Sequence, residues 1–288
     1  MKASAIEFRL RMVIQVIIVS IGMWAPWVRP WDFERRISTL QWLALEMSRL
    51  GLASFTVSAP VVIIFGALLA AAGAVLRVWG AAYLGYNVVH HEKMQAGAVV
   101  AAGPYRYMRN PLYLGGWCMM AAFSLLLTPS GALFIMALIT IFYLRLILGE
   151  EAFLVAQLGE PYREYLRAAP RILPRLGAGL PRAAAQPHWL TALLTEVMPI
   201  GIFVTLAFVS WTFDNGLMLR WILVSFVASM VARGLMKETI PTCVFLVIGP
   251  AAWGLFHLSI FRAMLIALGA SMVVRALMPR ERANPDPA

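Results

Sequence analysis

The sequence GPYRYMRNPLYLGGW, at residues 103–117, opens the central segment of this chain. It continues as an apolar segment, turns at the tetrapeptide TPSG (128–131), returns as a second apolar segment and ends on two adjacent glutamates. A four-residue turn makes consecutive helices antiparallel neighbours. The stretch therefore predicts a helical hairpin, with arms over 111–128 and 132–148, whose polar ends lie at the same face of a membrane.

The composition predicts an integral membrane protein. Of 288 residues, 61% are hydrophobic and only 13% are charged. A soluble domain of this length could not bury so much apolar surface, and several apolar runs approach the roughly 20 residues that cross a bilayer core. Cys118 and Cys243 both lie in apolar segments, which does not indicate a disulfide framework. The first apolar run lacks a small-residue cleavage site and is not expected to be a signal peptide.

The fold class expected is all-α, a polytopic helical bundle of about eight transmembrane helices plus one interfacial amphipathic helix. In the segment 29–54, Ile37, Leu40 and Met47 recur at helical spacing, which is typical of a helix that lies on the membrane. The apolar runs expected to span the bilayer are 12–28, 55–85, 111–128, 132–148, 189–213, 217–232, 241–261 and 263–278.

Changes of composition along the chain predict five regions. The basic linker rich in proline and glycine is the clearest boundary. The regions are an N-terminal span with the interfacial helix (1–54), a core (55–175), the linker (176–188), a C-terminal four-helix membrane domain of unknown role (189–279) and a polar tail (280–288).

The charges predict an orientation. The formal net charge is +10, and the cations flank the apolar runs, which suits anionic lipid headgroups and gives no reason to expect a nucleic acid partner. With the N-terminus in the cytoplasm, few of the 24 lysines and arginines fall on the outer side. Those few are Arg29, Arg35, Arg36, Arg49, Arg220 and Arg262. Both polar ends of the central hairpin are then cytoplasmic.

The start of the hairpin has the chemistry of an anion site. Asn110 stands at the N-cap and Pro111 at the first helical position, where the missing N–H is harmless. First-turn N–H groups and the helix dipole attract anions, and nearby arginines add donors. An ordinary interfacial helix start explains each residue singly. The return of Glu150 and Glu151 to the same face favours a ligand site, because two carboxylates suit a cation or a hydroxyl-bearing ligand.

This ordered set of motifs resembles the isoprenylcysteine carboxyl methyltransferase family and, more loosely, the phosphatidylethanolamine and phospholipid methyltransferases. The resemblance covers roughly residues 60–175. It rests on Glu92-Lys93, Gly103-Pro104-Tyr105, Arg109-Asn110-Pro111-Leu112-Tyr113-Leu114-Gly115, Glu150-Glu151, Gly159-Glu160-Pro161-Tyr162 with Tyr165, and Pro170-Arg171. The family has histidine where this chain has Asn110, and asparagine cannot titrate.

The resemblance implies an S-adenosylmethionine-dependent methyltransferase and a set of site residues. The cofactor site it implies consists of Gly103, Tyr105, Arg109, Asn110, Pro111, Tyr113, Gly115, Glu150, Glu151, Tyr162, Tyr165 and Arg171. The residues expected to act on the reacting groups are Arg109, Arg145 and Glu151. Arg109 or Arg145 could hold a carboxylate acceptor, although Arg145 could equally be an arginine that snorkels from the end of a span.

The methyl acceptor expected is lipophilic and enters from the bilayer, with a prenylcysteine-type carboxylate favoured. A phospholipid amine or a small thiol stays open and would need a base, for which His90, His91 or a glutamate is available. No metal site is expected. A membrane transporter or a non-catalytic scaffold is the alternative of another class, since Glu196 is an acidic residue inside an apolar run and such residues are often functional. The oligomeric state is left open.

Overall fold

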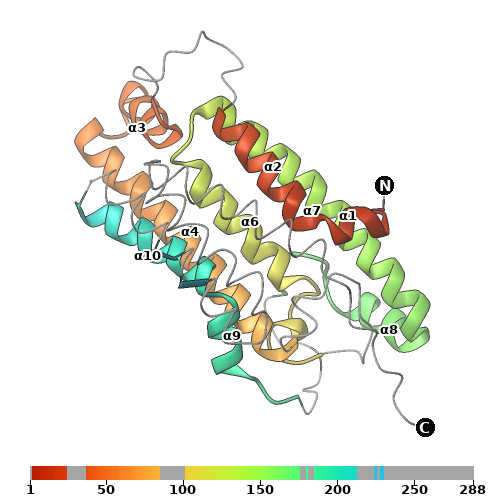
Figure 1. The fold of residues 1–288 in the computed structure, drawn as a ribbon. Helices are drawn as coiled ribbons and strands as arrows, with labels where there is room; N and C mark the ends of the chain where they lie inside the picture. The colour runs from red at the N-terminus through yellow and green to blue at the C-terminus, as the bar shows by residue number, and fades with distance from the viewer. Residues whose placement is uncertain are drawn as a thin grey trace, which may run out of the picture. The chain divides into compact units, whose positions relative to one another are not determined.

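The computed structural model describes residues 2–24, 37–84, 101–175, 180, 185–212, 224–225 and 228–229. The chain divides into two compact units, residues 1–225 and 226–288, and the elements described here belong to the first. All are helices, and the described residues contain no strand, in agreement with the all-α expectation (Figure 1). In chain order they are α1 (Ala5–Arg9), α2 (Arg11–Trp24), α3 (Thr39–Arg49), α4 (Phe55–Leu84), the 3₁₀-helix η1 (Gly103–Arg106), α6 (Pro111–Ser124), α7 (Pro129–Leu158), α8 (Glu160–Ala168), α9 (Trp189–Thr195) and α10 (Val197–Thr212).

The predicted hairpin is formed by α6 and α7. Thr128 is the N-cap of α7, and its hydroxyl accepts a hydrogen bond from the N–H of Gly131 at 3.3 Å. The second arm continues beyond the apolar segment 132–148, through both glutamates to Leu158. It ends at Gly159, whose φ of +64° favours glycine. Sequence spacing predicts one continuous helix here, but this turn places Tyr162 and Tyr165 on the separate helix α8.

Small residues bring α4 and α6 together. A Cβ on Gly73 would lie 2.8 Å from the carbonyl oxygen of Gly115, and a Cβ on Gly115 would lie 2.8 Å from that of Gly73. Only glycine permits this approach of two backbones, which is a common way for membrane helices to pack. The close packing holds the first turns of α6 against the second half of α4.

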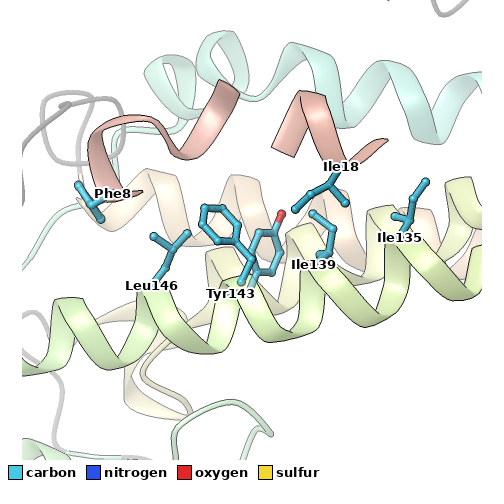
Figure 2. Close-up of a cluster of buried hydrophobic side chains, with 7 residues drawn as sticks. Phe8, Ile18, Ile135, Ile139, Tyr143 and Leu146 are labelled. Atoms are coloured by element: carbon cyan, nitrogen blue, oxygen red, sulfur yellow. The ribbon is translucent and has the colours of Figure 1, made fainter. Parts of the chain in front are cut away.

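On the other side of the hairpin, α1 and α2 pack along α7 (Figure 1). Figure 2 shows Phe8 and Ile18 facing side chains of α7, with Tyr143 among them. The buried members of this cluster are Phe8, Ile18, Ile135, Ile139, Phe142, Tyr143 and Leu146. The N-terminal helices are therefore packed against the core rather than separate from it.

The expected amphipathic helix forms as α3, at the end of the bundle where the hairpin turns. Ser38 caps it reciprocally with Gln41. The N–H of Thr39 donates to the carbonyl oxygen of Leu127 at 2.6 Å, and that of Leu40 donates to Leu125 at 2.9 Å. The hairpin turn is thereby tied to α3.

The number of spans stays below the expectation. Within the described residues, α4 and α7 are long and apolar enough to cross a membrane, and α2 is a shorter apolar helix. The run expected as one span over 189–213 is divided into α9 and α10, which are bent by 67° at Glu196 and would count as a third span only if taken together. The runs 217–232, 241–261 and 263–278 fall outside the described residues, apart from 224–225 and 228–229, so eight spans are not confirmed.

Candidate functional site

The loop before α6 is shaped by Gly103. Its φ is +53°, and a Cβ there would run into the ring of Tyr83 on α4. The turn buries Pro104 and Tyr105 in η1. The hydroxyl of Tyr105 points to α4, where it would lie 3.3 Å from a Cβ on Gly80, and it is buried without a hydrogen-bond partner among the described residues. A buried donor of this kind is available to a ligand.

The tyrosines of α8 support this loop. Tyr165 donates a buried hydrogen bond of 2.9 Å from its hydroxyl to the carbonyl oxygen of Tyr105, and its ring lies 5.8 Å from that of Tyr162. Burial raises the pKa of Tyr162 to about 12, and it raises the pKa of Tyr105 and of Tyr165 well above the usual value near 10. These phenols are therefore neutral hydrogen-bonding groups at physiological pH and are unsuited to act as bases.

The segment after α8 runs beside the loop. The N–H of Arg109 donates to the carbonyl oxygen of Pro170 at 2.9 Å, and the N–H of Arg175 donates to that of Tyr107 at 3.0 Å. Asn110 is the N-cap of α6 as expected, but its side chain does not cap the helix. Its Nδ2 donates to the carbonyl oxygen of Arg171 at 2.9 Å instead. Asn110, at the position where the family has histidine, therefore links the start of α6 to the segment after α8 by a hydrogen bond.

Glu151 lies between two arginines. An Nη atom of Arg109 is 3.1 Å from Oε1 of Glu151, and an Nη atom of Arg171 is 2.9 Å from Oε2. The Nε of Arg171 also donates to both oxygens, at 3.3 and 3.2 Å. The side chains of Glu151 and Arg109 are only 8% and 11% exposed, whereas Arg171 is 44% exposed. The charge of Glu151 is thus already compensated within the protein.

Glu150 has a different environment. The hydroxyl of Tyr113 donates to its Oε1 at 2.5 Å, and the Tyr113 ring packs edge-on against Tyr143 at 5.4 Å. The guanidinium of Arg11 is close enough to Glu150 for a favourable Coulombic interaction. Glu150 is therefore held by a tyrosine and approached by one cation, while Glu151 is clamped by two.

Two glycines make room for side chains beside the first turns of α6. A Cβ on Gly115 would lie 2.7 Å from Cγ of Arg77, and a Cβ on Gly116 would lie 3.0 Å from the hydroxyl of Tyr143. Pro111, at the first position of α6, is fully buried. The expected motif residues from the loop, α6, the end of α7, α8 and the segment after α8 thus come together at one end of the bundle.

Arg145 is not part of this cluster. Its guanidinium forms an ion pair with Glu7 of α1, with Nη2 at 2.8 and 2.9 Å from the two carboxylate oxygens. The hydrogen bond from Arg145 lowers the pKa of the Glu7 carboxyl to about 2. The structure therefore gives Arg145 a contact that fastens the N-terminal helix to α7, rather than one that faces Glu150 and Glu151.

Sequence reasoning missed the partner of Glu196. Arg77 of α4 donates from Nε to Oε2 of Glu196 at 2.6 Å, and from Nη2 to Oε1 at 3.0 Å. The side chains are 26% and 1% exposed. The available signal was that each is an isolated charge within an apolar run, because such charges usually pair with one another.

Some expected residues cannot be placed. His90, His91, Glu92 and Lys93 lie outside the described residues. Within the described part of the chain, no group of three or more histidine, cysteine, aspartate or glutamate side chains is arranged to hold a metal ion.

The groups present fit S-adenosylmethionine. The Nε of Arg109 and the hydroxyl of Tyr105 are buried donors without partners among the described residues, and both suit acceptor atoms of such a ligand. First-turn N–H groups of α6 have no partner within the helix. Glu150 supplies a carboxylate for the positive groups. The site thus offers both donors for an anionic group and a carboxylate for a cationic one.

One comparison with known families gives a match. Residues 61–160 match the family model for phospholipid methyltransferases. No curated protein and no solved structure matches the chain. The matched range contains the loop, the hairpin and both glutamates, but it ends before Tyr162, Arg171 and Glu196. The match supports a membrane methyltransferase that acts on lipid.

Proposed function

We propose that this protein, whose residues 61–160 match the phospholipid methyltransferase family model, transfers a methyl group from S-adenosylmethionine to a lipid within the membrane. The observation that carries the proposal is the convergence of Tyr113–Glu150 and Arg109–Glu151–Arg171 at the start of α6. These contacts join the matched hairpin to a segment beyond it, and they leave buried donors beside a carboxylate.

S-adenosylmethionine supplies a methyl group already activated by a positively charged sulfur. The protein therefore has to bind, orient and exclude water rather than activate the donor. Glu150 attracts the positive groups of the ligand, and Arg109 donates from its buried Nε to an anionic group. Tyr105 offers its buried hydroxyl as a second donor. Glu151 holds Arg109 in place.

The charges of the site favour an amine acceptor over a carboxylate acceptor. A prenylcysteine-type carboxylate needs a cation to hold it, and both arginines expected in that role are already paired, Arg109 with Glu151 and Arg145 with Glu7. An amine that is methylated must lose a proton to a base. A buried glutamate of the site can accept it, either Glu150, whose carboxylate accepts a hydrogen bond from Tyr113, or Glu196.

The decisive experiment is methyl transfer into separated lipid classes. Purified full-length protein in detergent would receive radiolabelled S-adenosylmethionine and, in separate reactions, phosphatidylethanolamine, a farnesylated cysteine peptide or an alkyl thiol. We expect label in the phospholipid. Label only in the farnesylated peptide would show that the acceptor is a carboxylate, and label only in the thiol would show S-methylation.

The same preparation tests the alternatives of other classes. A transporter or a scaffold has no need to bind S-adenosylmethionine. We therefore expect calorimetry to detect binding of S-adenosylhomocysteine, the reaction product. A protein that binds neither compound and labels no acceptor would contradict the methyltransferase proposal.

A further inference from the structure

The ion pair between Arg77 and Glu196 lies outside the cofactor contacts and is not explained by them. It joins α4 to the break between α9 and α10, beyond the end of the family match. Glu196 is completely buried, and its backbone (φ −104°, ψ 23°) is where the helix is interrupted. Arg77 is seven residues before the end of α4, or about 10 Å along the helix.

Stability alone is a weak reason for such a pair. Taking two charges out of water costs as much as their attraction returns, so apolar residues of the same size often serve equally well. Ionisable residues at membrane depth more commonly belong to a functional site. Broken helices likewise occur where the irregular backbone is buried in protein or lines a binding site. The pair and the helix break coincide at one residue.

The pair also adjoins the candidate active site. Arg77 lies against Gly115, and one of its Nη atoms is 3.5 Å from the carbonyl oxygen of Leu112, in the first turn of α6. The unpartnered hydroxyl of Tyr105 lies beside Gly80, which follows Arg77 by three residues on α4 and so shares its face of the helix. The ion pair therefore lies next to the first turn of α6 and to Tyr105, and the Arg77 side chain is 26% exposed.

We propose that Arg77 and Glu196 bind the headgroup of the methyl acceptor, and that this headgroup is zwitterionic. Arg77 takes the anionic group and Glu196 takes the cationic amine, so that α9 and α10 contribute half of the acceptor site. The proposal rests on the proposed function and adds the residues that recognise the headgroup. No bond forms or breaks in this binding step.

Charge pairing explains the selectivity. When a zwitterion enters, the ion pair opens and each side chain exchanges one opposite charge for another, so no buried charge is left unpaired. An anionic lipid would satisfy Arg77 but would leave Glu196 unpaired, which is costly in a buried place. A lipid without charges would satisfy neither. The pair therefore excludes singly charged lipids as well as admitting the zwitterion.

The test is lipid binding by native mass spectrometry on full-length protein in detergent. The probes share acyl chains and differ in headgroup: phosphatidylethanolamine, its N-acetyl derivative, which is anionic, and phosphatidylglycerol. We expect the zwitterion to bind at least about tenfold more tightly than either anionic lipid, about 1.4 kcal/mol. Farnesylcysteine with a free amine also carries both charges. Tighter binding of this compound than of its N-acetyl form would show that the zwitterionic ligand can be a prenyl compound.

Variants separate recognition from folding. Glu196→Gln should lower the affinity for phosphatidylethanolamine about tenfold without lowering that for phosphatidylglycerol. The double variant Arg77→Glu with Glu196→Arg restores an ion pair with the two charges exchanged. Its melting temperature should be closer to that of the wild type than the melting temperature of Glu196→Gln is, but it should not prefer phosphatidylethanolamine over phosphatidylglycerol as the wild type does. Glu46→Gln, in an exposed pair with Arg49, is the matched control and should behave as wild type.

Each outcome decides the proposal. Equal binding of phosphatidylethanolamine and its N-acetyl derivative by the wild-type protein overturns it, whether or not any variant folds. A folded Glu196→Gln protein with the wild-type ratio also overturns it. Failure of the proposed function would give a different result. If headgroup selectivity depends on Glu196 but no lipid is methylated, the headgroup site is supported and the methyltransferase proposal is contradicted.

Discussion

At the scale of single residues, the two adjacent glutamates have different tasks. Glu150 accepts a hydrogen bond from Tyr113, and Glu151 is shared by Arg109 and Arg171. A helix turns about 100° per residue, so neighbours in sequence face different surroundings. The sequence presents them as one acidic pair, and only their partners distinguish them.

Glu150→Gln should weaken binding of S-adenosylmethionine about tenfold, about 1.4 kcal/mol. The amide keeps an acceptor for Tyr113 but loses the charge that attracts the positive groups of the ligand. Calorimetric titration measures the affinity, and the melting temperature of the unliganded protein should change little. Unchanged affinity would remove Glu150 from the cofactor site.

Glu151→Gln should instead reduce stability. It leaves Arg109 buried with its charge uncompensated, which costs about 3 kcal/mol, the lower end for a broken buried pair since Arg171 can turn to solvent. Thermal unfolding in detergent would show the loss. Arg163→Gln, in an exposed pair with Glu160, is the control and should unfold like the wild type. A stable Glu151→Gln protein that only binds cofactor weakly would contradict this division of tasks.

Gly103 offers a sharper test of the loop. Gly103→Ala meets two obstacles, the left-handed φ and the ring of Tyr83. Gly51→Ala meets only the first, because nothing lies within 4 Å of a Cβ there and its φ is +70°. The left-handed backbone costs alanine about 1–2 kcal/mol in both. The Gly103 variant should lose about 1–3 kcal/mol more through overpacking, seen as a lower melting temperature. Equal losses would contradict the contact with Tyr83.

At the scale of elements, α1 is fastened to α7 by one ion pair. The pKa of Glu7 in the folded protein is about 2, below the ordinary value of 4.5, so the charged form is favoured when α1 is docked. The pair therefore contributes fully above pH 4.5, and its contribution is lost as the pH falls from 4.5 toward 2. The neighbouring cluster of Phe8 and Leu146 stays in contact through apolar packing.

Hydrogen exchange of residues 2–9 should report this dependence. In the wild-type protein, protection of α1 relative to α4 should fall between pH 5 and pH 3. Glu7→Gln should already show the lower protection at pH 5 and little further loss. Glu46→Gln serves as the control. A wild-type α1 whose relative protection does not respond to pH would contradict the role given to the pair.

At the scale of the whole molecule, the orientation in the membrane stays a prediction from charge. Leu50 and Arg163 are exposed positions at the two ends of the bundle, after α3 and on α8. In a background with Cys118→Ser and Cys243→Ser, an impermeant maleimide should label Leu50→Cys in intact cells. It should label Arg163→Cys only after the membrane is opened. The reverse pattern would place the site outside.

The sequence by itself determined the helical hairpin, the start of α6 at Pro111, the length of α4 and the grouping of the loop with the two glutamates. These follow from the length of apolar runs, from proline and glycine at helix ends and from a short turn, all of which act between near neighbours. Only the tertiary structure decided that Arg145 binds Glu7, 138 residues away, and that Arg77 binds Glu196, 119 residues away. It also decided that α7 stops at Gly159, that Glu151 pairs with Arg109 and Arg171 while Glu150 accepts from Tyr113, and that the run after 188 breaks at Glu196. Buried charges take partners from whichever helices pack beside them, and that packing is a property of the whole bundle.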